Sequence, residues 1–207
     1  MSDLISLIAA TLLLSLVHAA IPNHWVPLVL VGRVEKWTLL ETQWATLLTG
    51  FAHIFSTLLL GVVLGYIGFQ LSEQYKVISE VFAPLLLIFM GLVYFASNSN
   101  HQHLDEAKIL KNKSKISIIS SLCISMFLSP CLEIETYFFT AGTQGIYSMI
   151  LIAIVYLFST LFGMLVLVSL GFKSLEKYNW HFLEHHERRI TGSMLIVLGI
   201  ISFFIKF

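Results

Sequence analysis

Apolar residues form six long stretches along the chain, separated by shorter polar segments. The stretches cover about residues 4–32, 42–68, 77–97, 116–142, 146–171 and 190–206. Several run for about 18 residues or more with almost no charge, and an α-helix needs about 20 apolar residues to cross a bilayer. The pattern therefore predicts an all-α, polytopic membrane protein with six transmembrane helices.

The first and fourth stretches are interrupted by proline. HAAIPNH (18–24) carries Pro22, and SPCLEIET (129–136) carries Pro130. Proline removes a backbone hydrogen bond and clashes with the preceding turn, so it bends or breaks a helix. We expect both helices to be broken near these prolines, with polar side chains next to each break.

The second half of the chain resembles the first. HIFSTLLLGVVLGYIGF (53–69) matches YLFSTLFGMLVLVSLGF (156–172), and LIFMGLVYF (87–95) matches LIVLGIISF (195–203). We interpret residues 1–207 as a single membrane domain made of repeat one (1–98), a loop (99–115) and repeat two (116–207). Because each repeat has three helices, the two repeats must have opposite orientations. Inverted repeats with broken helices are typical of transporters, whose substrate site lies near the middle of the bilayer.

Composition agrees with a membrane location. Hydrophobic residues make up 57% of the chain and charged residues 12%, with a mean hydropathy of +0.85, whereas soluble domains average about 25% charged residues. The partner indicated is the lipid bilayer. The formal net charge of zero gives no indication of a nucleic-acid partner.

The basic residues predict the orientation. Of the 12 lysines and arginines, all but two fall on the face opposite the termini, and cytoplasmic loops carry the excess of such residues. We expect a multi-pass protein of the inner (plasma) membrane, with both termini outside and the two hydrophilic loops in the cytoplasm. The residues on the loop face are Arg33, Lys36, Lys108, Lys111, Lys113, Lys115, Lys173, Lys177, Arg188 and Arg189, and Lys76 and Lys206 lie on the other face.

Three histidines are expected at membrane depth. His18 and His24 are about 240° apart on an ideal helix, so they can share a ligand only if the break at Pro22 brings them together. His53 lies about midway along the second stretch, next to Ser56 and Thr57. Ionisable groups inside a membrane are costly and usually functional. Three imidazoles suit Ni, Co, Zn, Fe or Cu, although each histidine could instead bond a neighbouring helix.

Two glutamates follow the second break. Glu133 and Glu135 should lie at mid-membrane depth, where an ionised carboxylate is costly unless it is paired with a cation or a proton. The two side chains point in nearly opposite directions on a helix, so one could complete a metal site while the other pairs elsewhere or exchanges a proton. The alternative is that the helix is short and both glutamates lie at the membrane interface.

Other residues are secondary candidates for metal binding. Cys131 is a soft ligand, although a single buried cysteine more often serves packing. HQHLDE and HFLEHHE are short histidine-rich tracts in the predicted cytoplasmic loops, where they could capture a metal or simply be solvated. The secondary set is Asn23, Cys131, His101, His103, His181, His185 and His186.

Taken in order, these motifs resemble the nickel/cobalt efflux permeases of the NicO type. The matching segments are HAAIPNH, with its two histidines six apart, GFAHIFSTLLLGVVLG around His53, and the Pro-Cys of LSPCLEIET; HQHLDE matches the family's histidine-bearing loop only thinly. The wider superfamily includes nickel/cobalt uptake permeases, urease-accessory-like membrane proteins and the CcdA/DsbD electron conduits. The resemblance implies divalent metal transport, with His18, His24 and His53 as metal-site residues.

The sequence departs from that family in ways that leave the metal and the direction of transport open. Asn23 stands where the uptake permeases have an acidic residue, and the histidine-rich loop of exporters is much reduced. Glu133 and Glu135 are not expected in the family.

Other functions remain open. A CcdA-like thiol-disulfide conduit would need a cysteine in each repeat, and the first repeat has none. HFLEHH fits one histidine box of a membrane di-iron enzyme, but such enzymes need several boxes. A metal-supplying accessory protein would need the same ligands as a transporter.

We expect a non-enzymatic, proton-coupled exporter of a divalent transition metal. Its site would contain His18, His24 and His53, with Glu133 or Glu135. The sequence leaves the oligomeric state open.

Overall fold

The computed structural model describes residues 2–71 and 114–174, with a few helical residues between 85 and 96 and between 192 and 200. Most of the predicted third and sixth helices, the loop at 99–113 and the segment 175–191 lie outside the described residues. Within these residues, the continuous helices are α1 (Ser2–Ala19), α2 (Pro22–Val34), α3 (Leu39–Leu71), α6 (Lys115–Phe127), α7 (Leu132–Gln144) and α8 (Ile146–Ser174).

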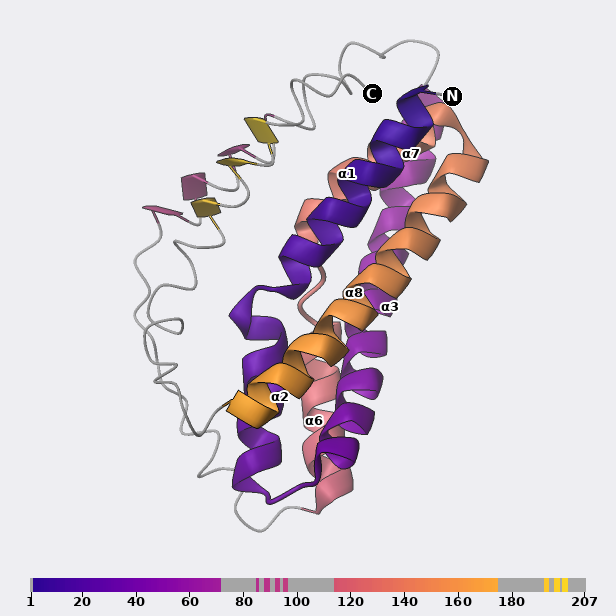
Figure 1. Cartoon of the computed structure of the whole chain (residues 1–207). Helices are drawn as coiled ribbons and strands as arrows, with labels where there is room; N and C mark the ends of the chain where they lie inside the picture. Colours follow the sequence, from indigo (N-terminus) through magenta and orange to yellow (C-terminus); the bar gives the residue numbers. More distant parts are fainter. Residues whose placement is uncertain are drawn as a thin grey trace.

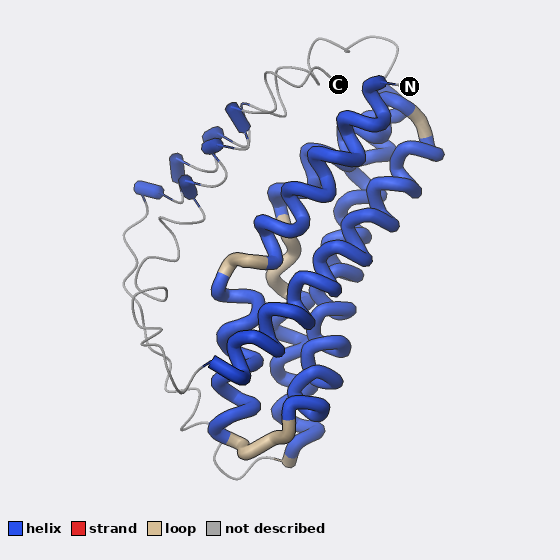
Figure 2. The backbone as a smooth tube through the Cα atoms, viewed as in Figure 1, coloured by secondary structure: helices blue, strands red, loops and turns tan. Residues whose placement is uncertain are grey.

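The described helices form an elongated bundle (Figure 1; Figure 2). The two long helices, α3 and α8, run along its length. The broken pairs α1–α2 and α6–α7 lie beside them, with α1 and α7 in the half that contains the N-terminus and α2 and α6 in the other half. Consequently, the two breaks lie at the middle of the bundle.

This architecture confirms an all-α protein with membrane-spanning helices. Leu4–Val34, Leu39–Gln70 and Ile146–Ser174 are each long and apolar enough to cross a bilayer, and Lys115–Gln144 makes a fourth span if its two bent parts are taken together. Large apolar side chains cover the outside of these helices, and hydroxyl and imidazole groups lie inside. The total of six spans and the inverted relation of the repeats stay predictions.

The first break follows from Pro22. The residue before a proline avoids the α-helical conformation, and Ile21 is extended, with φ −62° and ψ 127°. Pro22 then occupies the first turn of α2, where its missing N–H costs nothing. The indole of Trp25 donates to the carbonyl oxygen of Ala20 at 3.3 Å, which satisfies a backbone group released by the break.

The second break separates α6 from α7, whose axes differ in direction by 53°. α6 ends at Phe127, Pro130 lies in the connection, and Cys131 is the N-cap of α7 in an extended conformation. Its backbone N–H donates to the hydroxyl of Thr57 on α3 at 3.0 Å. The break is therefore anchored to the middle of α3.

Glycines bring α3 and α7 into close contact. A methyl group added to Gly61 would overlap the ring of Phe138, one added to Gly68 would overlap the carbonyl group of Phe139, and one added to Gly142 would overlap the carbonyl group of Gly65. Small residues at helix interfaces allow such approach in membranes, where apolar side chains gain little by leaving lipid. The packing fixes the position of α7, and with it the second break.

The basic residues of the described helices gather at one end. Arg33, Lys36, Lys115 and Lys173 all lie at or next to helix ends opposite the N-terminus (Figure 1). There Lys115 pairs with Glu41 at 2.5 Å, and Arg33 bonds the carbonyl oxygen of Phe172. The clustering supports a common orientation of these spans, and the assignment of this end to the cytoplasm stays a prediction.

Replacing Gly142 by alanine should destabilise the protein by about 1–3 kcal/mol, because the added methyl group meets backbone rather than a flexible side chain. The expected result is a lower apparent melting temperature of the detergent-purified protein. Gly50→Ala is the matched control, since its methyl group would meet only the ends of flexible side chains, Leu161 at 3.0 Å and Met164 at 3.5 Å. Equal melting temperatures for the two variants would contradict the proposed α3–α7 packing.

Candidate metal centre

Three imidazoles meet at the first break, each from a different helix. His18 lies in the last turn of α1, His24 in the first turn of α2 and His53 in the middle of α3. The ring centroids of His18 and His24 are 4.2 Å apart, those of His24 and His53 4.8 Å, and those of His18 and His53 5.7 Å. All three side chains are buried. The break thus brings together two histidines that a straight helix would separate.

The spacing of these nitrogens suits a transition metal. The Nε2 atoms of His18 and His53 are 3.4 Å apart. Two nitrogens bound tetrahedrally at about 2.0–2.1 Å from zinc would be about 3.3–3.4 Å apart. The ligand atoms of His18, His24 and His53 all lie within 4.8 Å of one another, so small ring rotations would bring the third nitrogen to bonding distance. The residues present therefore fit a metal ion.

Cys131 and Glu133 lie on the other side of His18. Cys131 is the N-cap of α7 and Glu133 is in its first turn, and both are buried. The sulfur of Cys131 is 3.4 Å from Nδ1 of His18, and Oε2 of Glu133 is 3.9 Å from the same nitrogen. The Cys131 thiol donates to Oε2 of Glu133 at 3.0 Å. These three residues form a second group of neighbouring ligand atoms.

Adjacent turns of α3 connect the histidine group to the group that contains Cys131 and Glu133. The hydroxyl of Thr57 donates to the carbonyl oxygen of His53 at 3.0 Å and accepts from the backbone N–H of Cys131 at 3.0 Å. The imidazole of His53 also lies next to the carbonyl groups of Met126 and Ser129 at the second break. One helix therefore positions His53 relative to both breaks.

Glu135 lies outside both groups. Its side chain is buried, and neither carboxylate oxygen has a hydrogen-bond partner among the described residues. It follows Glu133 by two positions on α7, about 200° around the helix, so only Glu133 faces His18. A carboxylate in such surroundings must be protonated or meet a cation, because an unpaired charge is very costly there.

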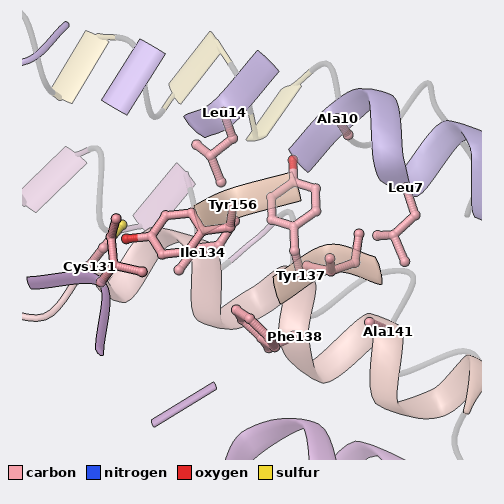
Figure 3. Packing of buried hydrophobic residues seen from close by; sticks show 11 residues of the cluster. Leu7, Ala10, Leu14, Cys131, Ile134, Tyr137, Phe138, Ala141 and Tyr156 are labelled. Carbon is pink, nitrogen blue, oxygen red and sulfur yellow. The ribbon is translucent and has the colours of Figure 1, made fainter. Parts of the chain in front are cut away.

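Tyr156 is a site residue that the sequence analysis did not select. It is fully buried on α8, and its hydroxyl lies beside Cys131 and Thr57; Figure 3 shows the ring directed toward Cys131. The signal was present in the internal repeat, where Tyr156 aligns with His53 in the pair YLFST and HIFST.

The structure thus brings together His18, His24, His53, Cys131 and Glu133, and leaves Glu135 apart. The N-terminal turn of α2 includes Asn23, but its side chain is not described. The loop candidates lie outside the described residues, namely His101, His103, His181, His185 and His186.

Comparison with known proteins gives no match: no protein-family model, no curated protein and no solved structure matches this chain.

Replacing Thr57 by valine should destabilise the second break. The variant leaves the buried N–H of Cys131 without its acceptor, which costs about 1–3 kcal/mol. The expected result is a lower apparent melting temperature and faster hydrogen exchange at the start of α7, measured by mass spectrometry.

Ser56→Ala is the control for this prediction. The Ser56 hydroxyl donates to the same carbonyl oxygen of His53 at 2.8 Å, but the described contacts of that hydroxyl do not reach α7. If both variants exchange alike at residues 131–135, the anchoring role of Thr57 is wrong.

Proposed function

We propose that this protein carries a divalent transition-metal ion across the membrane, and that its binding site contains His18, His24 and His53, with Glu133 on the other side of His18. The observation that carries the proposal is the convergence of three buried imidazoles, from three helices, at a break in a membrane-length span. The ion is the substrate.

A metal ion accounts for this arrangement better than helix-to-helix hydrogen bonding does. A neutral imidazole has one N–H donor and one nitrogen that accepts, so a pair of histidines can satisfy one another. A third imidazole facing the same space adds a further lone pair. A cation satisfies all three together, and nitrogen ligands favour Ni, Co, Zn, Fe or Cu over hard ions such as Mg.

Transport is favoured over storage or catalysis by where the site lies. It is at the middle of the bundle, between two broken spans, which is where secondary transporters bind their substrates. The two three-helix repeats would rock against one another and expose the site to each side in turn. This reading agrees with the resemblance to NicO-type nickel/cobalt efflux permeases, which stays part of the proposal.

Export coupled to protons is the form of transport that we propose. The predicted cytoplasmic loops carry the additional histidines, which would collect the ion from the cytoplasm. Glu135 is the candidate proton carrier, since its carboxylate is buried near the site and lies outside both groups of ligand atoms.

The first test is metal analysis of the detergent-purified protein. We expect close to one metal ion per chain in the parent and less than a tenth of that in His18→Ala/His53→Ala, because the double variant loses two nitrogens of the site. Inductively coupled plasma mass spectrometry measures the content and identifies the metal.

His103→Ala is the matched control, since it removes a histidine from the predicted loop and should keep the metal. Two irons that survive the double substitution would contradict the proposal and favour a membrane metalloenzyme. If the parent binds metal but reconstituted vesicles move none in either direction, a metal-supplying accessory protein replaces the transporter.

A further inference from the structure

The imidazole of His18 lies between two sets of ligand atoms. Its Nε2 faces Nε2 of His53 at 3.4 Å, and its Nδ1 faces the sulfur of Cys131 at 3.4 Å. Since the two nitrogens of an imidazole point away from one another, one ion cannot bond both. A neutral ring has only one nitrogen free to bind a metal while the other carries hydrogen. His18 can therefore serve only one of the two sets at a time.

The second set has the spacing of a metal site. Nδ1 of His18 lies 3.4 Å from Sγ of Cys131 and 3.9 Å from Oε2 of Glu133, and the sulfur and this oxygen are 3.0 Å apart. Tetrahedral zinc, with bonds of about 2.3 Å to sulfur and about 2.0–2.2 Å to nitrogen and oxygen, would require about 3.4–3.6 Å. The shortest of the three separations is the hydrogen bond from the Cys131 thiol to Glu133. An ion bound there would take the place of that hydrogen.

The two sets differ in charge. Three neutral imidazoles leave a divalent cation with its full charge in a water-poor interior. A thiolate and a carboxylate together carry two negative charges, which neutralise the ion. Because burying an uncompensated charge is costly, the ion rests more favourably with Cys131 and Glu133.

We propose that the substrate occupies two positions in sequence, which share His18: a three-nitrogen position with His24 and His53, and a sulfur-containing position with Cys131 and Glu133. The transported ion is then one with affinity for thiolate, of the Zn, Co or Ni class, rather than a hard ion such as Mn or Mg. This inference rests on the proposed function and adds to it the second position and the class of substrate.

In each position, the nitrogen of His18 that does not bind the ion carries hydrogen and faces a hydrogen-bond partner. When Nε2 binds the ion, Nδ1–H faces Cys131 and Glu133; when Nδ1 binds it, Nε2–H faces His53. Binding at the second position releases the thiol proton of Cys131 to solvent as the metal–sulfur bond forms, while Glu133 stays ionised as a ligand. No oxidation or reduction is involved.

His24 and Glu133, one from each position, come from opposite halves of the bundle. His24 begins α2, in the half of the bundle distant from the N-terminus, and Glu133 begins α7, in the half that contains it (Figure 1). A step from the first position to the second moves the ion toward the end that is predicted to face outward.

Cobalt(II) provides the test, because a thiolate ligand adds an intense near-ultraviolet charge-transfer band that nitrogen and oxygen ligands lack. We expect the parent protein, loaded with one equivalent of Co(II) in detergent, to show this band. Cys131→Ser should lose the band while still binding Co(II) through His18, His24 and His53. His24→Ala/His53→Ala should keep the band. Both variants should lose at least nine-tenths of Co(II) transport in vesicles.

Cys123→Ser is the matched control, since Cys123 lies in α6, in neither group of ligand atoms. This variant should keep both the band and transport.

Three outcomes would contradict the proposals. A parent protein that binds Co(II) without the band, or a Cys131→Ser variant with an unchanged spectrum or normal transport, overturns the second position and leaves the proposed function standing. Two Co(II) ions bound at once overturn sequential occupancy. A parent protein that binds no Co(II), Ni(II) or Zn(II) overturns the proposed function itself.

Discussion

The structure depends on how two backbone breaks are accommodated in the middle of bilayer-length helices. An unpaired backbone group costs several kcal/mol in lipid, so irregular backbone at membrane depth must be buried within protein. Here the two breaks lie at about the same level along the bundle (Figure 1). Trp25 satisfies the carbonyl of Ala20, and Thr57 satisfies the N–H of Cys131. The broken spans are stable because other side chains complete their hydrogen bonds.

The same breaks determine which side chains meet. His18 belongs to the last turn before one break, and Cys131 and Glu133 belong to the first turn after the other. The close α3–α7 packing through Gly61, Gly65, Gly68 and Gly142 then fixes the distance between the two ends. A change in that packing would move the sulfur and carboxylate relative to His18. The arrangement of ligands is thus a property of helix packing as much as of the ligands themselves.

Polarity inside the bundle favours a cation over an anion. The buried hydroxyls of Thr46, Thr49 and Thr57 on α3 each donate to a carbonyl oxygen of their own helix. Their hydrogens are therefore occupied, and their oxygen lone pairs remain to face neighbours. The imidazoles, the thiol of Cys131 and the carboxyl groups of Glu133 and Glu135 also offer lone pairs, so the polar interior consists mainly of electron-pair donors. This polarity agrees with the proposed passage of a metal ion.

The sequence by itself determined the all-α membrane class, both broken helices and the residue types of the centre. Proline acts locally on the backbone, and a run of apolar residues has no stable place except in lipid or a core, so these features need no tertiary information. Sequence spacing could not decide which glutamate faces His18, because that depends on the rotation of α7 against α3. From the sequence, Cys131 was only a secondary candidate for metal binding, and Tyr156 was not identified. Only tertiary packing set these residues against His18 and Thr57. Cys131 lies 74 positions from Thr57 and 113 from His18 in the chain, and such residues meet through helix contacts that no local pattern encodes.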